Sequence, residues 1–257
     1  SDGNTIGGTN AGDSITTGEY NTVIGKDAGT AITGGEKNTA VGALALDANT
    51  TASSNTAVGY SALGANTTGA ENVAMGRDTL GDNTTGASNT ALGKSALGSN
   101  TTASNNTAVG KSALAANTTG TSNTAVGANA LDANTTADSN TAVGHHALSA
   151  TTTGNSNVAI GDYAMSASTT ADRNVAVGSN AMASLTADGD SYNTAIGFRA
   201  AQNSTSATQF TALGADTLTA QTTANYNVAI GYLSGSSLTT GGSNTSVGRA
   251  SLSQNVT

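Results

Sequence analysis

Two adjacent histidines are the residues whose type most readily suggests chemistry. His145 and His146 are the only imidazoles in the chain, and an imidazole can act as a general base, a pH sensor or a metal ligand. Ser and Thr are abundant, but a hydrolase also needs an orienting group beside its nucleophile and base. The pair directly follows the motif "NTAVG" at residues 140–144. We interpret it as two exposed turn residues, with a metal or pH-sensing site as the alternative.

A second candidate is the acidic segment "ADGDSY" at residues 187–192. Its paired carboxylates, Asp188 and Asp190, suggest glycoside cleavage or, because carboxylate oxygens suit a hard cation, calcium binding. The segment lacks the fuller ligand set of an EF-hand loop, which favours a lengthened turn. Aromatic and charged residues follow it in a chain with only 3% aromatic residues, so we predict a contact patch here. The candidate patch comprises Asp188, Asp190, Tyr192, Phe198, Arg199 and Phe210.

The composition narrows the range of functions. The chain of 257 residues has no Pro, Cys or Trp, and only 9% of its residues are charged, which is low for an enzyme. Its net charge of −8 argues against a nucleic-acid partner, which requires a basic surface, and against an anionic membrane. No apolar run is long enough to span a bilayer, so no direct membrane insertion is expected. We predict a protein that is not an enzyme, with no catalytic residue, cofactor or metal.

A 17-residue repeat organises the whole chain. Numbered from its first residue, the unit begins at Asn4, Asn21, Asn38, Asn55, Asn72, Asn89, Asn106, Asn123, Asn140, Asn157, Asn174, Asn193, Phe210, Asn227 and Asn244. The step from Asn174 to Asn193 is 19 residues, which places a two-residue insertion within residues 187–192. No composition shift marks a boundary, so residues 1–257 are predicted to form a single repeat domain. Because the chain begins and ends inside its own repeat, we expect a fragment of a longer fibrous protein.

The residues at each repeat position predict the fold. Position 5 is Gly in all fifteen units, position 4 is Val, Ile, Leu or Met in fourteen, and position 13 is Thr in fourteen. An invariant Gly indicates a turn with positive φ or a close backbone approach. Short β-prone segments between such turns, without Pro, predict an all-β, parallel β-solenoid of about fifteen rungs, one per unit. Each rung is expected to hold two strands, at roughly "NTAV" and "ALxANTT". The Asn residues at positions 1 and 12 are predicted either to stack as amide ladders or to support turns.

Position 3 suggests contact between chains. Within "NTAVG", positions 2 and 4 point to one side of a strand and position 3 to the other, and we expect positions 2 and 4 to face inward. Position 3 should then be exposed and variable, yet it is Ala in twelve units. We interpret it as a seam between chains, and the alternative is a flattened single-chain coil with both faces internal. The candidate seam residues are Ala57, Ala91, Ala108, Ala125, Ala142 and Ala159.

The motifs "NTAVG", "NVAIG" (157–161) and "NTAIG" (193–197) resemble a known repeat. They look like the "NSVAIG"-type repeats of YadA-like trimeric autotransporter adhesin heads, and the same repeat style resembles that of phage tail-fibre shafts. The resemblance covers essentially the whole chain, although the period of 17 residues is longer than the adhesin unit. It implies a homotrimer at an exterior surface and leaves open which of the two relatives applies.

These expectations combine into one functional prediction. The chain is expected to be a trimeric phage tail-fibre shaft that projects a host-recognition tip, with the head of a bacterial trimeric surface adhesin as the alternative. Its partners would be its own copies and a cell-surface receptor or polysaccharide, at the virion or bacterial surface. An ice- or carbohydrate-binding solenoid is a further alternative. Ice binding calls for two outward Thr columns separated by one residue, whereas the Thr columns at positions 13 and 14 are adjacent and should face opposite ways.

Overall fold

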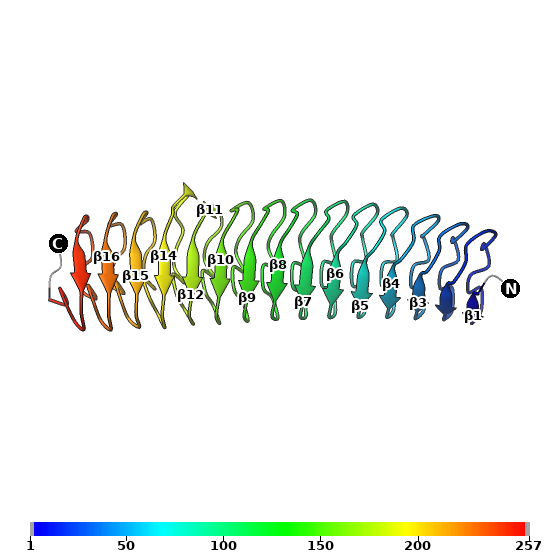
Figure 1. Cartoon of the computed structure of the whole chain (residues 1–257), viewed down its shortest axis with the longest axis horizontal. Coiled ribbons are helices and arrows are strands. Elements are labelled where there is room, and N and C mark those ends of the chain that lie inside the picture. Colours follow the sequence, from blue (N-terminus) through cyan, green and yellow to red (C-terminus); the bar gives the residue numbers. More distant parts are fainter. Residues whose placement is uncertain (1–2, 255–257) are drawn as a thin grey trace. The chain divides into compact units, whose positions relative to one another are not determined.

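The computed structural model describes residues 3–254 and is an all-β parallel solenoid, which confirms the predicted fold class (Figure 1). Each of the fifteen sequence units contributes one strand of three residues, at repeat positions 2–4. These strands are β1 (Thr5–Gly7), β2 (Thr22–Ile24), β3 (Thr39–Val41), β4 (Thr56–Val58), β5 (Val73–Met75), β6 (Thr90–Leu92), β7 (Thr107–Val109), β8 (Thr124–Val126), β9 (Thr141–Val143), β10 (Val158–Ile160), β12 (Val175–Val177), β14 (Thr194–Ile196), β15 (Thr211–Leu213), β16 (Val228–Ile230) and β17 (Thr245–Val247). Two shorter strands, β11 (Ala171–Asp172) and β13 (Gly189–Asp190), lie at the insertion.

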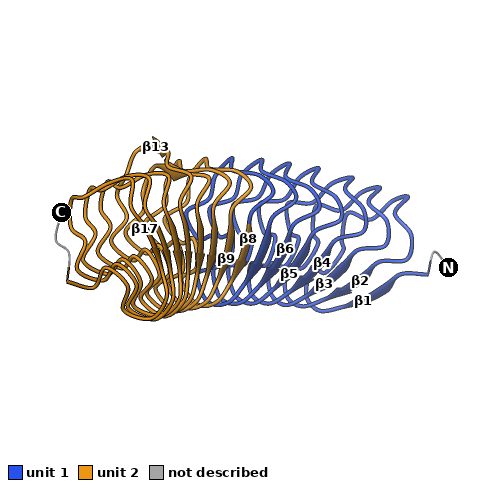
Figure 2. Ribbon diagram, turned by 60° about the vertical axis from the view of Figure 1, so that its left-hand side comes forward, with its two compact units in different colours: residues 1–123 blue, residues 124–257 orange. Residues whose placement is uncertain are grey.

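The chain forms two compact units, residues 1–123 (unit 1) and residues 124–257 (unit 2) (Figure 2). In unit 1, strands β1 to β7 pair in parallel in chain order. In unit 2, strands β8, β9, β10, β12 and β14 to β17 do the same. Like positions pair with like, as Ala40 does with Ala57. Every pairing within a unit therefore keeps the register that the repeat predicts.

The two-residue insertion is absorbed outside this ladder. Val175 still pairs with Thr194 across the step of 19 residues, so the extra residues do not shift the strands. They form the turn that contains β13, which pairs with β11 and projects beyond the neighbouring turns of unit 2 (Figure 1).

The strands face the opposite way from the prediction. In every three-residue strand from β2 to β17 the middle residue, position 3, is buried in the core, and positions 2 and 4 point outward. In β4, for example, Ala57 is fully buried between half-buried Thr56 and Val58. The expectation that Thr and Val would face inward was therefore wrong.

The seam prediction fails for the same reason. Every residue proposed for it is 0% exposed within a single chain, so none can lie on a surface that another chain covers. These residues are Ala57, Ala91, Ala108, Ala125, Ala142 and Ala159. The alternative weighed for position 3, a single-chain coil with both faces internal, is correct for position 3 alone, because positions 2 and 4 face outward.

Position 3 faces position 9 across the core, and a large side chain at either position is matched by a small one at the other. A Cβ atom added to Gly29 at position 9 would lie 3.2 Å from Cγ1 of Val23 at position 3. Where position 9 is the fully buried Leu63, position 3 of that rung is Ala57. A rung has room for one large side chain between these two positions, because protein interiors are close-packed. The Ala column is therefore the complement of the Leu column.

The second predicted strand, at "ALxANTT", is absent. Positions 7 and 9 adopt positive φ, as in Ser112 (57°) and Leu114 (52°), and a chain that alternates in this way cannot remain extended. This side of each rung is a series of turns, yet its backbone amides still donate hydrogen bonds to the next rung. The amide of Leu97, for example, donates to the carbonyl of Ala113 at 3.0 Å.

The invariant glycine at position 5 meets both predicted requirements. Gly42 has φ of 137°, and a Cβ atom added there would lie 2.5 Å from the carbonyl oxygen of Gly59 in the next rung. Any side chain at this position would collide with the backbone of its neighbour. The close stacking of rungs therefore requires glycine.

Buried Asn and half-buried Thr side chains form ladders from rung to rung, and the Asn ladders are one of the two predictions made for Asn. At position 1, the backbone amide of Asn55 donates to Oδ1 of Asn38 at 3.0 Å. At position 12, Nδ2 of Asn83 donates to Oδ1 of Asn66 at 2.8 Å. The position 13 hydroxyl of Thr67 donates to the carbonyl of Thr84 at 3.0 Å. These bonds satisfy polar groups that would otherwise be costly to bury.

Candidate functional site

The side chains that are free to meet a ligand lie on the turns and on the outward face of the strands, because the inward columns are occupied by stacking. One hollow of the surface lies in unit 1 and another lies in unit 2. The inserted turn and the histidine pair add two further clusters of polar side chains, both in unit 2.

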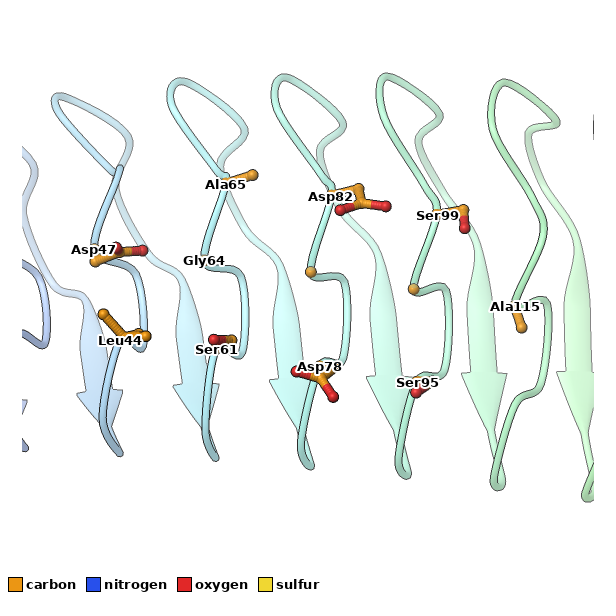
Figure 3. Close-up of a pocket in the computed structure, with 12 residues that line it drawn as sticks. Leu44, Asp47, Ser61, Gly64, Ala65, Asp78, Asp82, Ser95, Ser99 and Ala115 are labelled. Carbon is orange, nitrogen blue, oxygen red and sulfur yellow. The ribbon is translucent and has the colours of Figure 1, made fainter.

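Unit 1 carries an open groove of about 660 Å³ along its turns (Figure 3). Position 7 contributes Leu44, Ser61 and Asp78 from successive rungs, and positions 10 and 11 contribute Asp47 and Asp82. The remaining lining residues are Gly, Ala and Ser. No imidazole, amine or guanidinium lines this groove, although the adjacent Arg77, which is not among its lining residues, pairs with Asp78 at 3.5 Å.

Each of the two compact units has one aspartate at repeat position 10 whose pKa is raised, Asp47 in unit 1 and Asp132 in unit 2. Burial raises the pKa of Asp47 above its ordinary value, backbone hydrogen bonds oppose the rise, and the charge of Asp27 adds to it. Burial also raises the pKa of Asp132, while a backbone hydrogen bond and the charge of His146 oppose it. Oδ1 of Asp132 is buried without a hydrogen-bond partner among the described residues. Both carboxylates are therefore poorly solvated when charged.

Unit 2 carries a smaller cleft of about 340 Å³, which we call the Arg199 cleft. It is lined by Arg199, Gln202, Asn203, Asp216, Thr219, Tyr232 and Leu233. Nε and Nη2 of Arg199 lie 2.8 and 2.7 Å from Oδ1 of Asp216. The guanidinium carbon of Arg199 also lies 4.8 Å from the ring centre of Phe198. This cleft therefore combines an ion pair, amides, a hydroxyl and an aromatic side chain.

The acidic residues of the inserted turn are bound by the rung before it. Oγ1 of Thr170 donates to Asp188, and Arg173 forms an ion pair with Asp190. The hydroxyl of Tyr192 donates to Oδ2 of Asp190 at 2.9 Å. The two carboxylates thus contact different partners instead of converging on one point. Nowhere in residues 3–254 do three His, Cys, Asp or Glu side chains gather closely enough to hold a metal ion.

The predicted contact patch divides into three parts. Asp188, Asp190 and Tyr192 lie on the inserted turn before β14, whereas Phe198 and Arg199 follow the other end of that strand. Phe210 is only 1% exposed because it occupies position 1, where the other units bury Asn. Its assignment to a surface patch was wrong. An aromatic ring at an inward position is packed as core however unusual it is in the repeat.

Sequence reasoning missed Arg173, Asp216 and Tyr232, which complete these clusters. The signal was present in the columns. Arg199 and Asp216 both occupy position 7 in consecutive rungs, and Phe198 and Tyr232 both occupy position 6 two rungs apart. Residues 17 positions apart are neighbours in a stack of this period, so a search along columns would have paired them.

The histidine pair lies on a turn and forms a ring cluster with the next rung. The rings of His145 and His146 are 4.1 Å apart, and His146 stacks on Tyr163 at 5.1 Å. Nδ1 of His145 lies 3.1 Å from Oδ1 of Asp162, which is itself half exposed. Each imidazole thus has neighbours that orient it, but no described Ser or Thr hydroxyl is hydrogen-bonded to either ring.

Comparison with known proteins gives no assignment, because no family model and no curated protein sequence matches the chain. Within residues 3–254 no helix has the length and apolar character needed to cross a membrane.

Proposed function

We propose that this chain is a non-enzymatic structural segment of an extracellular fibre, first of a phage tail-fibre shaft and alternatively of a bacterial trimeric adhesin head. The observation that carries the proposal is the use of buried polar side chains. The Asn and Thr columns bond each rung to the next, so adding a rung adds length, by about 4.8 Å, with the same interface each time. Such a device suits a spacer that holds a recognition tip away from a surface.

The proposed homotrimer needs a seam other than the Ala column. The outward residues at position 4 form an apolar column along the strands of each unit. In unit 2 the exposed members range from 36% to 63% exposure, and they are Val126, Ile160, Ile196, Leu213, Ile230 and Val247. A continuous apolar surface of this kind commonly marks a protein contact. We assign the chain-to-chain contact of the proposed trimer to this column.

Light scattering coupled to size exclusion tests the trimer. The wild-type chain should have three times the mass of a monomer. The double variant Ile160→Glu with Ile196→Glu should dissociate, because it places charges in the apolar column. Thr153→Glu adds a charge at an exposed position 14 of the same unit and should leave the trimer intact. A wild-type chain that is folded and monomeric would contradict this assignment.

Ice binding is the second candidate function. The sequence analysis considered the Thr columns at positions 13 and 14, but the structure offers a better-suited face at positions 2 and 4. Positions 2 and 4 both face outward with one buried residue between them, as in Thr141, Ala142 and Val143. Each unit therefore presents parallel outward columns of Thr and of Val or Ile, repeated at about 4.8 Å. Thermal hysteresis of the purified chain, lost in Thr141→Lys and kept in Thr153→Glu, would support this function. A trimer that covers the same face should show none.

A further inference from the structure

The Arg199 cleft of unit 2 has the composition of a ligand site, which the unit 1 groove lacks. We propose that it binds a neutral saccharide. Its volume of about 340 Å³ lies at the small end of the range for ligand pockets. The groove of unit 1 is larger but is lined by carboxylates and small side chains, without an aromatic ring.

The charges in the Arg199 cleft are already balanced, which selects against an ionic ligand. Two nitrogens of Arg199 contact Oδ1 of Asp216, and the Asp216 side chain is only 13% exposed. Because the pair carries no net charge, it offers neither an anion nor a cation a net Coulomb attraction. A neutral ligand can bind beside the pair and leave it intact.

The remaining polar atoms suit a ligand rich in hydroxyl groups. Both guanidinium contacts fall on Oδ1 of Asp216, and no described residue donates a hydrogen bond to Oδ2. The amides of Gln202 and Asn203 line the same cleft, and each offers a donor and an acceptor. The hydroxyl of Thr219 makes only long contacts, at 3.4 and 3.5 Å, with the carbonyls of Asp216 and Ser236. A sugar hydroxyl, which both donates and accepts, can bond to all of these groups.

Two exposed rings supply the apolar surface that a sugar ring needs. Tyr232 lines the cleft and is 47% exposed, and Phe198 is 49% exposed at the same repeat position two rungs away. Two rungs correspond to about 10 Å along the stack. The C–H face of a pyranose carries partial positive charge and packs on the negative face of an aromatic ring. A saccharide of two or more units lying along the stack can therefore contact both rings.

Both rings are held in place by arginines. The guanidinium carbon of Arg199 lies 4.8 Å from the centre of Phe198, and that of Arg249 lies 5.9 Å from the centre of Tyr232. Such contacts restrict the rotation of exposed rings. A pre-oriented ring loses less conformational freedom when a ligand binds.

The test measures binding of four neutral tetrasaccharides, cellotetraose, maltotetraose, mannotetraose and chitotetraose, by saturation-transfer NMR and titration calorimetry. At least one should bind the full chain with a dissociation constant of about 1 mM or lower. Tyr232→Ala should weaken that binding at least about tenfold. Tyr60→Ala is the matched control, because Tyr60 occupies the same position 6 in unit 1 and is 53% exposed. It should leave the affinity unchanged, and thermal unfolding should show that both variants are folded.

The proposal is overturned if none of the four sugars binds, if Tyr232→Ala binds as tightly as the wild type, or if Tyr60→Ala loses the same affinity. The inference goes beyond the proposed fibre function and does not depend on the trimer. A monomeric chain that binds the sugar would contradict the trimer alone, and a trimer that binds none of the sugars would contradict the cleft alone.

Discussion

Units 1 and 2 share the inward columns at positions 1, 3 and 9 and differ at the inward position 12 and on their turns. Both stack Ala at position 3, Leu or Met at position 9 and Asn at position 1. The exposed rings of unit 1 are Tyr20 and Tyr60, whereas unit 2 exposes Tyr163, Tyr192, Phe198, Tyr226 and Tyr232. The arginines of unit 2 each lie against a ring, whereas the described ion pairs of unit 1 join a cation to the adjacent Asp.

This difference shows which residues are constrained by the stacking of rungs and which residues are free to vary. An inward residue must fit the rungs on both sides, and positions 1, 3 and 9 are repeated with little change, whereas position 12 varies in unit 2, as in Thr151, Leu185 and Gln221. A turn residue contacts solvent and can vary without altering the register. Recognition in such a protein is therefore to be sought where the turns depart from the repeat, as they do most in unit 2.

The largest expected effect is at position 5. Gly59→Val in unit 1 and Gly161→Val in unit 2 each place a side chain at φ near +135° and against the backbone of the next rung. Each should lower the free energy of unfolding by more than about 3 kcal/mol, which thermal denaturation followed by circular dichroism would measure. Gly64→Ala is the control, since its added Cβ would meet no atom closer than 3.4 Å. A tolerated Gly161→Val would show that unit 2 is not stacked as unit 1 is.

Removing a core side chain should have the next largest effect, again equally in the two units. Leu63→Ala and Leu148→Ala each remove a fully buried side chain and should cost about 2–5 kcal/mol. Because position 3 faces position 9, adding Ala142→Val to Leu148→Ala should restore part of the loss. Chemical denaturation of the single and double variants would measure the coupling. No recovery in the double variant would contradict the complementary packing of these two columns.

Breaking an amide ladder should cost less. In unit 1, Asn89→Ala at position 1 removes the donor that serves both Oδ1 of Asn72 and the carbonyl of Ala103. The buried acceptors left behind should lower the free energy of unfolding by about 1–3 kcal/mol. In unit 2, Asn157→Ala removes the donor to Oδ1 of Asn140 and to the carbonyl of Ala171 and should cost a similar amount. A cost confined to one unit would refute the equivalence of their inward columns.

The smallest expected effect depends on pH and concerns the aspartates at position 10. Burial raises the pKa of Asp47 and of Asp132. Between the ordinary and the raised pKa the folded chain holds more protons than the unfolded chain. The free energy of unfolding should therefore fall as pH rises through that window. Asp47→Asn and Asp132→Asn should each stabilise the chain at pH 7 and have little effect below the ordinary pKa of aspartate. Thermal unfolding across this pH range would measure the difference, and an Asn variant that is less stable at pH 7 would contradict the assignment.

Several features of the fold follow from the sequence alone. The period places Ala40 beside Ala57, and the invariance of position 5 indicates a backbone approach too close for a side chain. Repetition of Asn at position 1 predicts the amide ladder that Asn38 and Asn55 form. The candidate site was predicted less well. The sequence analysis named Arg199, which lines the cleft, but it missed Asp216 and Tyr232, which only the structure places beside it.

What the sequence determined is the register, because a period of 17 residues allows like positions to stack only on like. What only the tertiary structure decided is which face of each strand is inside. Alternation shows that Ala142 points away from Thr141 and Val143, but it assigns neither side to the core. That choice depends on the turns that face the strand across the core. There Leu148, at a positive φ, fills the space that a larger residue at position 3 would need. A core residue that comes from a turn leaves no alternating pattern in the sequence. For this reason the Ala column, which was expected at a contact between chains, lies in the interior of a single chain.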